Sequence, residues 1–203
     1  MTRAYVHNLL GDLGQARAAG EAACAITTES GTTTYGAWAE RELAIALATL
    51  GEIGRATDLL RGLPVPIERQ DIVGIGIASL RIRLDAGQLA EAAAVAADAA
   101  VALDWPRPLS AGVLDWLGLA TEALVAAGRI GEARRIASSM DTVPLEDGGV
   151  HTLVACSRVA VAEERYAEAV GELVRGCEFL HAVGYALLEE VRLHRWDEAT
   201  PAP

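Results

Sequence analysis

The sequence has no lysine, and all 17 of its basic residues are arginine. This absence excludes a P-loop lysine, a Schiff-base lysine and a lysine general base from any chemistry of this chain. Aromatic residues make up 4% of the sequence, phenylalanine occurs once, and β-branched runs of strand length are scarce. Because strands are enriched in these residue types, their shortage argues against a sheet and favours an all-α fold.

Cysteines are few and odd in number, and Cys24, Cys156 and Cys177 all fall in segments with helical patterning. A disulfide framework is therefore not expected, and a reducing compartment is favoured. Residues 1–15 lack the apolar core and the cleavage site of a signal peptide, and no uncharged run reaches the roughly 18 residues of a membrane span. We therefore expect a cytoplasmic protein with no membrane partner.

Positive charge is also in short supply, since the formal net charge is −11. A field of this sign repels a phosphate backbone, so we expect no direct contact with nucleic acid. Apolar residues, by contrast, make up 52% of the chain, and alanine supplies many of them. Alanine has the highest helix propensity and lets helices pack closely, which again indicates a helical protein.

One short pattern occurs five times: a turn residue, any residue, a large apolar residue, Gly or Ala, any residue, and Ala. The matches are GDLGQA at 11–16, GEIGRA at 51–56, GQLAEA at 87–92, GRIGEA at 128–133 and ERYAEA at 164–169. Their first residues are 40, 36, 41 and 36 positions apart. Similarity at a period of about 20–50 residues is typical of repeat proteins, in which each unit buries its apolar face against its neighbours. The alternating spacing predicts loops of alternating length between the units.

Each match predicts a turn between two antiparallel helices. Glycine at its first position fits a helix C-cap, where a positive φ costs glycine little. Two sets of small residues are expected to let the second helix pack closely on the first: Ala56, Ala92, Ala133 and Ala169, and, two positions earlier, Gly54, Ala90, Gly131 and Ala167. Helices are predicted over 2–10, 13–27, 34–50, 53–62, 67–85, 89–103, 110–127, 130–140, 147–162, 166–182 and 185–196.

The pattern resembles the tetratricopeptide (TPR) repeat, whose helix pair carries Gly before the turn and Ala at the start of the second helix, as at Gly51 and Ala56 or Gly128 and Ala133. The resemblance covers nearly the whole chain. The family's Trp-x2-Leu-Gly-x2-Tyr signature is missing, however, and the units are longer than its usual 34 residues. Long, alanine-rich units of this kind are similar to the repeat regions of large bacterial regulators of the LuxR or cyclase type. HEAT and armadillo arrays have a period near 40 but lack the Gly-to-Ala turn, so they rank second.

The resemblance implies one domain, an all-α, right-handed α-solenoid of about five TPR-like antiparallel helix pairs plus a C-terminal capping helix. The expected units are 1–29, 30–64, 65–105, 106–144 and 145–183, followed by a cap at 184–196 and a tail at 197–203. The cap mixes apolar with charged residues, as an end helix does: Tyr185, Leu187, Leu188 and Val191 with Glu189, Glu190, Arg192 and Arg195.

The first helix has no such mixture, because Tyr5, Val6, Leu9 and Leu10 make it apolar. An open solenoid end of this kind exposes a strip of core. We therefore expect another molecule to cover it, either the remainder of a longer protein or a second copy in a homodimer.

In the TPR family the first helices line a concave groove, and positions 13, 10 and 6 before the turn residue point inward. Here these positions hold Trp38, Arg41 and Ile45; Gly74, Ile77 and Arg81; Asp115, Gly118 and Glu122; His151, Val154 and Arg158. The resemblance thus implies a partner-binding site at Trp38, Arg41, Arg81, Asp115, Glu122, His151 and Arg158. Arg81, Glu122 and Arg158 either bind a charged partner or pair with one another. Trp38 is either a binding contact or a core residue between the first units.

Signatures of catalysis are weak. Gly74-Ile75-Gly76 begins like a dinucleotide loop, but Ser79 replaces the third glycine and no strand precedes it, so a close helix crossing is the better interpretation. Two pairs have the spacing of metal ligands on a helix: Cys177 with His181, and Glu190 with His194. Two ligands do not complete a zinc site. We therefore expect no enzyme, no metal site and no cofactor.

The sequence predicts a non-enzymatic helical-repeat scaffold that binds a protein or peptide, as part of a bacterial signalling or transcription regulator. The alternative is a regulatory domain that senses a small molecule held in the concave groove. Because one fold hosts many functions, the resemblance alone does not choose between them.

Overall fold

The computed structural model describes residues 2–31, 33–63, 68–105, 109–140 and 150–199, and it describes only the backbone of residues 2, 9, 33, 34, 111, 150 and 183–199. Its elements are α1 (Thr2–Leu10), α2 (Leu13–Ser30), α3 (Thr33–Thr49), α4 (Ile53–Gly62), α5 (Arg69–Asp85), α6 (Leu89–Ala99), the 3₁₀-helix η1 (Ala100–Asp104), α7 (Ala111–Ala126), α8 (Ile130–Met140), α9 (Val150–Ala162) and α10 (Tyr166–Ala199). These ranges contain no strand, so the all-α prediction is confirmed.

All five predicted turns form between two helices. Their first residues have left-handed φ angles: 72° at Gly11, 86° at Gly51, 67° at Gly87, 74° at Gly128 and 61° at Glu164. At the second turn, the Gly51 N–H donates to the Ala48 carbonyl (2.9 Å) and the Glu52 N–H to the Leu47 carbonyl (2.8 Å). This is the Schellman arrangement, which satisfies carbonyl groups at a helix end. The turns therefore follow from the local sequence.

The alanines that follow these turns are buried as predicted. Ala56, Ala92 and Ala133 have no exposed surface, and Ala169 is 2% exposed. The prediction for the small residues two positions earlier is wrong, because Gly54, Ala90, Gly131 and Ala167 are all exposed. An added Cβ at Gly54 or Gly131 would have no neighbour within 4 Å. These positions lie in the first turn of the second helix, on its solvent side, and they do not control the packing.

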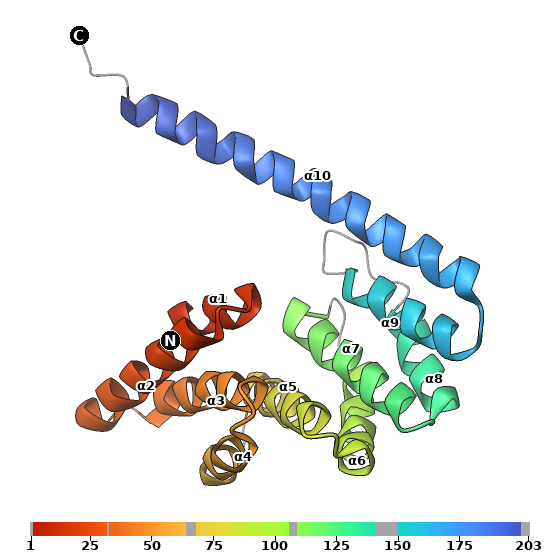
Figure 1. Cartoon of the computed structure of the whole chain (residues 1–203), viewed down its shortest axis with the longest axis horizontal. Helices are drawn as coiled ribbons and strands as arrows, with labels where there is room; N and C mark the ends of the chain where they lie inside the picture. Colours follow the sequence, from red (N-terminus) through yellow and green to blue (C-terminus); the bar gives the residue numbers. More distant parts are fainter. Residues whose placement is uncertain (1, 32, 64–67, 106–108, 141–149, 200–203) are drawn as a thin grey trace.

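The helices follow one another along a curved row, in chain order from α1 to α9 (Figure 1). Within each pair the two helices are in contact, and each of α2, α4, α6 and α8 also contacts the next first helix. The first helices α1, α3, α5, α7 and α9 contact one another in series. Each unit is thus packed mainly against its immediate neighbours.

The core lies between the helices of adjacent pairs. The larger cluster joins α5 to α9, and Leu114, Leu117 and Leu124 of α7 are at its centre with at most 1% of their surface exposed. A smaller cluster joins α3 and α4 to Ile82 of α5. Burying one such leucine contributes roughly 1.5–3 kcal/mol, so the contacts between pairs contribute substantially to the stability of the fold.

Two further predictions are wrong. The separate capping helix at 185–196 does not exist, because α10 continues without a break from Tyr166 to Ala199. A single Gly184 costs a helix only about 1 kcal/mol, and no proline follows within the helix to end it. The side chains of the predicted cap lie outside the part that the structure describes.

The alternating spacing of the turns does not come from the loops. It follows the length of the second helices: α2 has 18 residues, α4 has 10, α6 with η1 spans 89–104, and α8 has 11.

Candidate functional site

The predicted groove positions bring consecutive first helices together. Asp115 of α7 lies 3.8 Å from His151 of α9, measured between the carboxylate Oδ1 and the imidazole Nδ1. About two turns further along, Arg158 of α9 forms an ion pair with Glu122 of α7 at 2.9 Å. In both pairs the two residues hold the same position in successive units. The first helices of these units therefore lie side by side in register.

Arg41 is the centre of a second cluster, which joins three first helices. Its guanidinium lies 5.1 Å from the centre of the Trp38 ring, and its Nη2 is 3.1 Å from Glu42. Glu42 is nearly buried and also accepts a hydrogen bond from Asn8 Nδ2 of α1 at 3.2 Å. On its other side Arg41 packs against Gly74 of α5. Arg41 thus has its charge compensated, and Trp38 is only half-buried.

Arg81 differs from the other charged residues of the predicted site. Its side chain is exposed, and among the described residues it has no ion-pair or hydrogen-bond partner. The interpretation that the groove charges pair with one another therefore applies to Glu122 with Arg158. Arg81, in contrast, is available to an external carboxylate.

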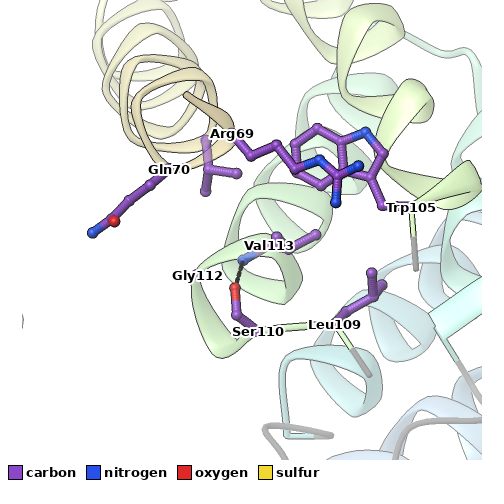
Figure 2. A pocket seen from close by; sticks show the side chains of 8 residues that line it. Arg69, Gln70, Trp105, Leu109, Ser110, Gly112 and Val113 are labelled. Carbon is purple, nitrogen blue, oxygen red and sulfur yellow. Dashed lines mark hydrogen bonds between the residues drawn. The ribbon is translucent and has the colours of Figure 1, made fainter. Parts of the chain in front are cut away.

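An open pocket that was not predicted lies near the N-terminal ends of α5 and α7. Its volume is about 520 Å³, and it is lined by Arg69, Gln70, Val73, Trp105, Leu109, Ser110, Gly112 and Val113. Figure 2 shows the Arg69 side chain reaching across the Trp105 ring, and the guanidinium carbon is 5.3 Å from the ring centre. The pocket therefore combines one cation and one aromatic face with an apolar lining.

Two interactions hold the pocket in shape. Ser110 caps α7, since the Val113 N–H donates to its Oγ at 3.4 Å (Figure 2). Trp105 leans against the buried Trp116, with ring centres 6.2 Å apart and planes inclined by 46°. Trp105 precedes Pro106 and Pro108 in the sequence, and no site was predicted there. The serine N-cap and the tryptophan beside a loop were the available signals.

The glycine pair of α5 has a packing role, although the space beside it is filled by large side chains and not by another helix backbone. A Cβ at Gly76 would lie 2.3 Å from Nε1 of Trp116, and a Cβ at Gly74 would lie 1.9 Å from Nη1 of Arg41. The two glycines thus leave room for large side chains from α7 and α3. At Gly74, a predicted groove position, the absence of a side chain makes room for Arg41.

Metal and thiol chemistry has little support in the described part of the chain. It contains no group of three or more His, Cys, Asp or Glu residues placed to hold a metal ion. The side chains of Glu190 and His194 lie outside this part. Burial raises the pKa of the Cys24 thiol, and the carboxylates of Glu40 and Glu21 raise it further, so the thiol is a weak nucleophile at neutral pH.

None of the helices, over the residues that the structure describes, has the length and hydropathy to cross a bilayer.

No family model, no curated protein and no solved structure matches this chain.

Proposed function

We propose that this chain is a right-handed α-solenoid of five TPR-like helix pairs that holds a protein or peptide partner along its first helices. The observation that carries the proposal is the in-register contact of equivalent residues, Asp115 with His151 and Glu122 with Arg158. Units that stack in this way present one continuous row of first helices, which is the surface that repeat proteins use for extended partners. The resemblance to bacterial regulators suggests a signalling or transcription complex as the setting.

The chemistry of this surface favours a partner with carboxylate and apolar side chains. Arg81 is exposed, Trp38 is half-buried, and Arg69 lies over Trp105 in the pocket. Arginine binds carboxylates through strong, charge-assisted hydrogen bonds, and tryptophan is enriched at binding hot spots. The chain as a whole carries a charge of −11, so these arginines are local points of attraction on an acidic protein. We infer that they select an acidic peptide with hydrophobic anchors.

A displayed peptide library tests this proposal directly. Peptides selected on the wild-type chain are synthesised, and their dissociation constants are measured for the wild type and for Arg81→Glu, Trp38→Ala and Trp105→Ala. Arg61→Glu is the matched control, because Arg61 is an exposed arginine of α4 whose one ion-pair partner among the described residues is Asp58. We expect the first three variants to weaken binding about tenfold or more, which is about 1.4 kcal/mol, and the control to leave it unchanged. Equal binding by all four variants would place the site elsewhere.

The pocket supports a second candidate function, the sensing of a small molecule. A volume of about 520 Å³ lies within the roughly 300–1,000 Å³ of ligand sites. Arg69 and Trp105 fit a ligand that carries an acid group on a flat or apolar body. A thermal-shift screen of organic acids distinguishes this function from the first. A compound that raises the melting temperature of the wild type but not of Trp105→Ala would favour sensing.

The predicted partner contact at the first helix also remains a proposal. The side chains of Tyr5, Val6 and Leu10 are exposed, and that of Leu9 lies outside the described part. In the later units the residue equivalent to Val6 is buried, as Ile82 is against α3 and α4. We propose that another molecule covers this strip, and Val6→Glu is the variant that tests it.

A further inference from the structure

The outer side of α10 carries an exposed apolar stripe, which we call the α10 seam. It consists of Tyr166, Val170, Leu173, Cys177 and Leu180, and its four large side chains other than the cysteine are 45–60% exposed. Beside the seam, Ala169 and Gly176 are buried where α10 packs on α9. Solvent-exposed apolar rows of this length on one helix are typical of interaction surfaces.

The earlier units show what normally covers this position. Leu173 is nine residues after the turn residue Glu164, and its equivalents in other units are Gly20, Leu60, Ala96 and Ala137. Leu60 is half-buried, and the other three are buried. Gly20 packs closely against Leu43 of α3, and the Ala137 carbonyl accepts a hydrogen bond from Cys156 of α9. At this position a following helix covers the second helix of the earlier units, so Leu173 marks a place where a helix can pack on α10.

The spacing of the seam identifies the kind of helix. Its residues are separated by four, three, four and three positions, which is the a/d repeat of a coiled coil. The d positions hold Tyr166, Leu173 and Leu180, and the a positions hold Val170 and Cys177. A β-branched residue at a with leucine at d favours two-stranded pairing. In the sequence the spacing continues through Gly184, Leu187 and Val191.

The charges of α10 allow the seam to meet a copy of itself. The positions that flank it, Ala167 and Val174 on one side and Ala169 and Gly176 on the other, carry no carboxylate or guanidinium group. The charged residues of this stretch lie at heptad positions b, c and f, away from the seam: Glu168, Glu172, Arg175 and Glu178. Two copies can therefore approach without placing like charges opposite each other.

The length of α10 leaves room for a partner. It has 34 residues, about 50 Å, whereas α9 has 13 residues, about 20 Å. Figure 1 shows α10 extending far beyond α9. Most of the stability of helices in proteins comes from the packing of an apolar face, so the exposed seam of α10 gains from a partner.

We propose that the α10 seam pairs with the same seam of a second copy of this chain, forming a two-stranded helical dimer interface. At roughly 60–120 Å² for each buried side chain, the five described residues of two copies bury about 600–1,200 Å². This is at the lower end of specific interfaces, so we expect a dissociation constant on the order of micromolar. The proposal does not depend on the peptide-binding function, since the seam and the predicted groove lie on different helices.

Analytical ultracentrifugation of the full chain over a concentration series tests the proposal. The variants are Val170→Glu and Leu180→Glu in the seam, and the matched control is Val101→Glu, because Val101 of η1 is as exposed as Val170. Circular dichroism and thermal melting verify that each variant folds. We expect a dimer for the wild type and the control, and a dissociation constant raised about tenfold or more in the seam variants. Higher salt should strengthen the dimer by screening the charge of −11 on each copy.

Three outcomes would overturn the proposal. The first is a wild type that is still monomeric at a protein concentration about 100-fold above the expected micromolar dissociation constant. This result would mean that the seam does not pair with itself and binds a helix of a different protein. Seam variants that dimerise as well as the control would place the interface elsewhere. A dimer that dissociates in Val6→Glu but not in the seam variants would show that the interface lies on α1.

Discussion

The guanidinium of Arg41 in α3 occupies the space that a side chain at position 74 of α5 would need. An ideal Cβ built on Gly74 would lie 1.9 Å from Nη1 and 2.8 Å from Cζ of Arg41. Glu42 and Trp38 hold the same guanidinium from the other sides, at 3.1 Å and 5.1 Å. Arg41 therefore cannot move aside without losing these partners. The absence of a side chain at one position thus fixes how two adjacent units meet.

Gly74→Ala should consequently destabilise the protein. Displacing Arg41 should cost about 1–3 kcal/mol, which exceeds the roughly 0.5–1 kcal/mol that alanine gains over glycine within a helix. Gly118→Ala is the control, because its Cβ would meet the His151 carbonyl at an ordinary 3.9 Å. Urea unfolding should show a lower midpoint for the first variant and an equal or higher one for the second. Equal stability of Gly74→Ala and the wild type would mean that Arg41 is not held in place.

Glu164→Gly should stabilise the protein. Glu164 has a φ of 61°, a left-handed conformation that costs an ordinary residue about 1–2 kcal/mol and glycine very little. Part of the gain is offset by the greater freedom of glycine in the unfolded chain, so we expect about 0.5–1 kcal/mol. Thermal or chemical unfolding measures the change.

The opposite substitution at an equivalent turn provides the check. Gly128→Ala should lose about 1–2 kcal/mol, because its φ is 74°. Gly131→Ala, three residues later, should gain about 0.5–1 kcal/mol, since its Cβ would point into open space. If both variants changed the free energy of unfolding in the same direction, the positive φ of Gly128 would not be the reason that this position needs glycine.

Ala133→Leu should overpack the contact between α7 and α8. Ala133 has no exposed surface and belongs to the larger core cluster, so three extra carbons require a shift of the helices, at a cost of about 1–3 kcal/mol. Ala94→Leu on the exposed side of α6 is the control and should be nearly neutral. Unchanged melting of Ala133→Leu would show that the pair contact is loose.

Glu163 should make stability depend on pH. The hydrogen bond from Arg134 of α8 lowers the pKa of Glu163, and Arg165 lowers it further. A lowered folded-state pKa stabilises the fold above the ordinary glutamate value of about 4.3, and this contribution is lost as the pH falls through the lowered value. The wild type should therefore be more stable than Glu163→Gln at neutral pH, and the difference should disappear in acid.

Glu178→Gln is the matched control for that experiment. Glu178 is exposed and, among the described residues, forms no ion pair. Its substitution removes one carboxylate without removing an ion pair between elements. If the stability of Glu163→Gln changed with pH in parallel with that of the wild type, the ion pair between Arg134 of α8 and Glu163 would contribute nothing to stability.

The features that the sequence by itself determined are local ones. A turn such as Gly51–Ala56 needs a residue that tolerates positive φ and a small residue a few positions later, and both requirements are visible in a short window of sequence. Low aromatic content and abundant alanine were enough for the all-α class. The pairing of helices across each turn follows from the same windows, because a short turn leaves two amphipathic helices no other nearby surface.

Only the tertiary structure decided which residues meet across units. Arg41 with Gly74 and Glu122 with Arg158 are 33 and 36 positions apart in the numbering, and their contact depends on the angle and register of neighbouring helices. The pocket at Arg69 and Trp105 likewise combines separate segments. The solvent exposure of Gly54 and the continuity of α10 past Gly184 could not be predicted either. Small residues and single glycines are compatible with several environments, and packing selects one of them.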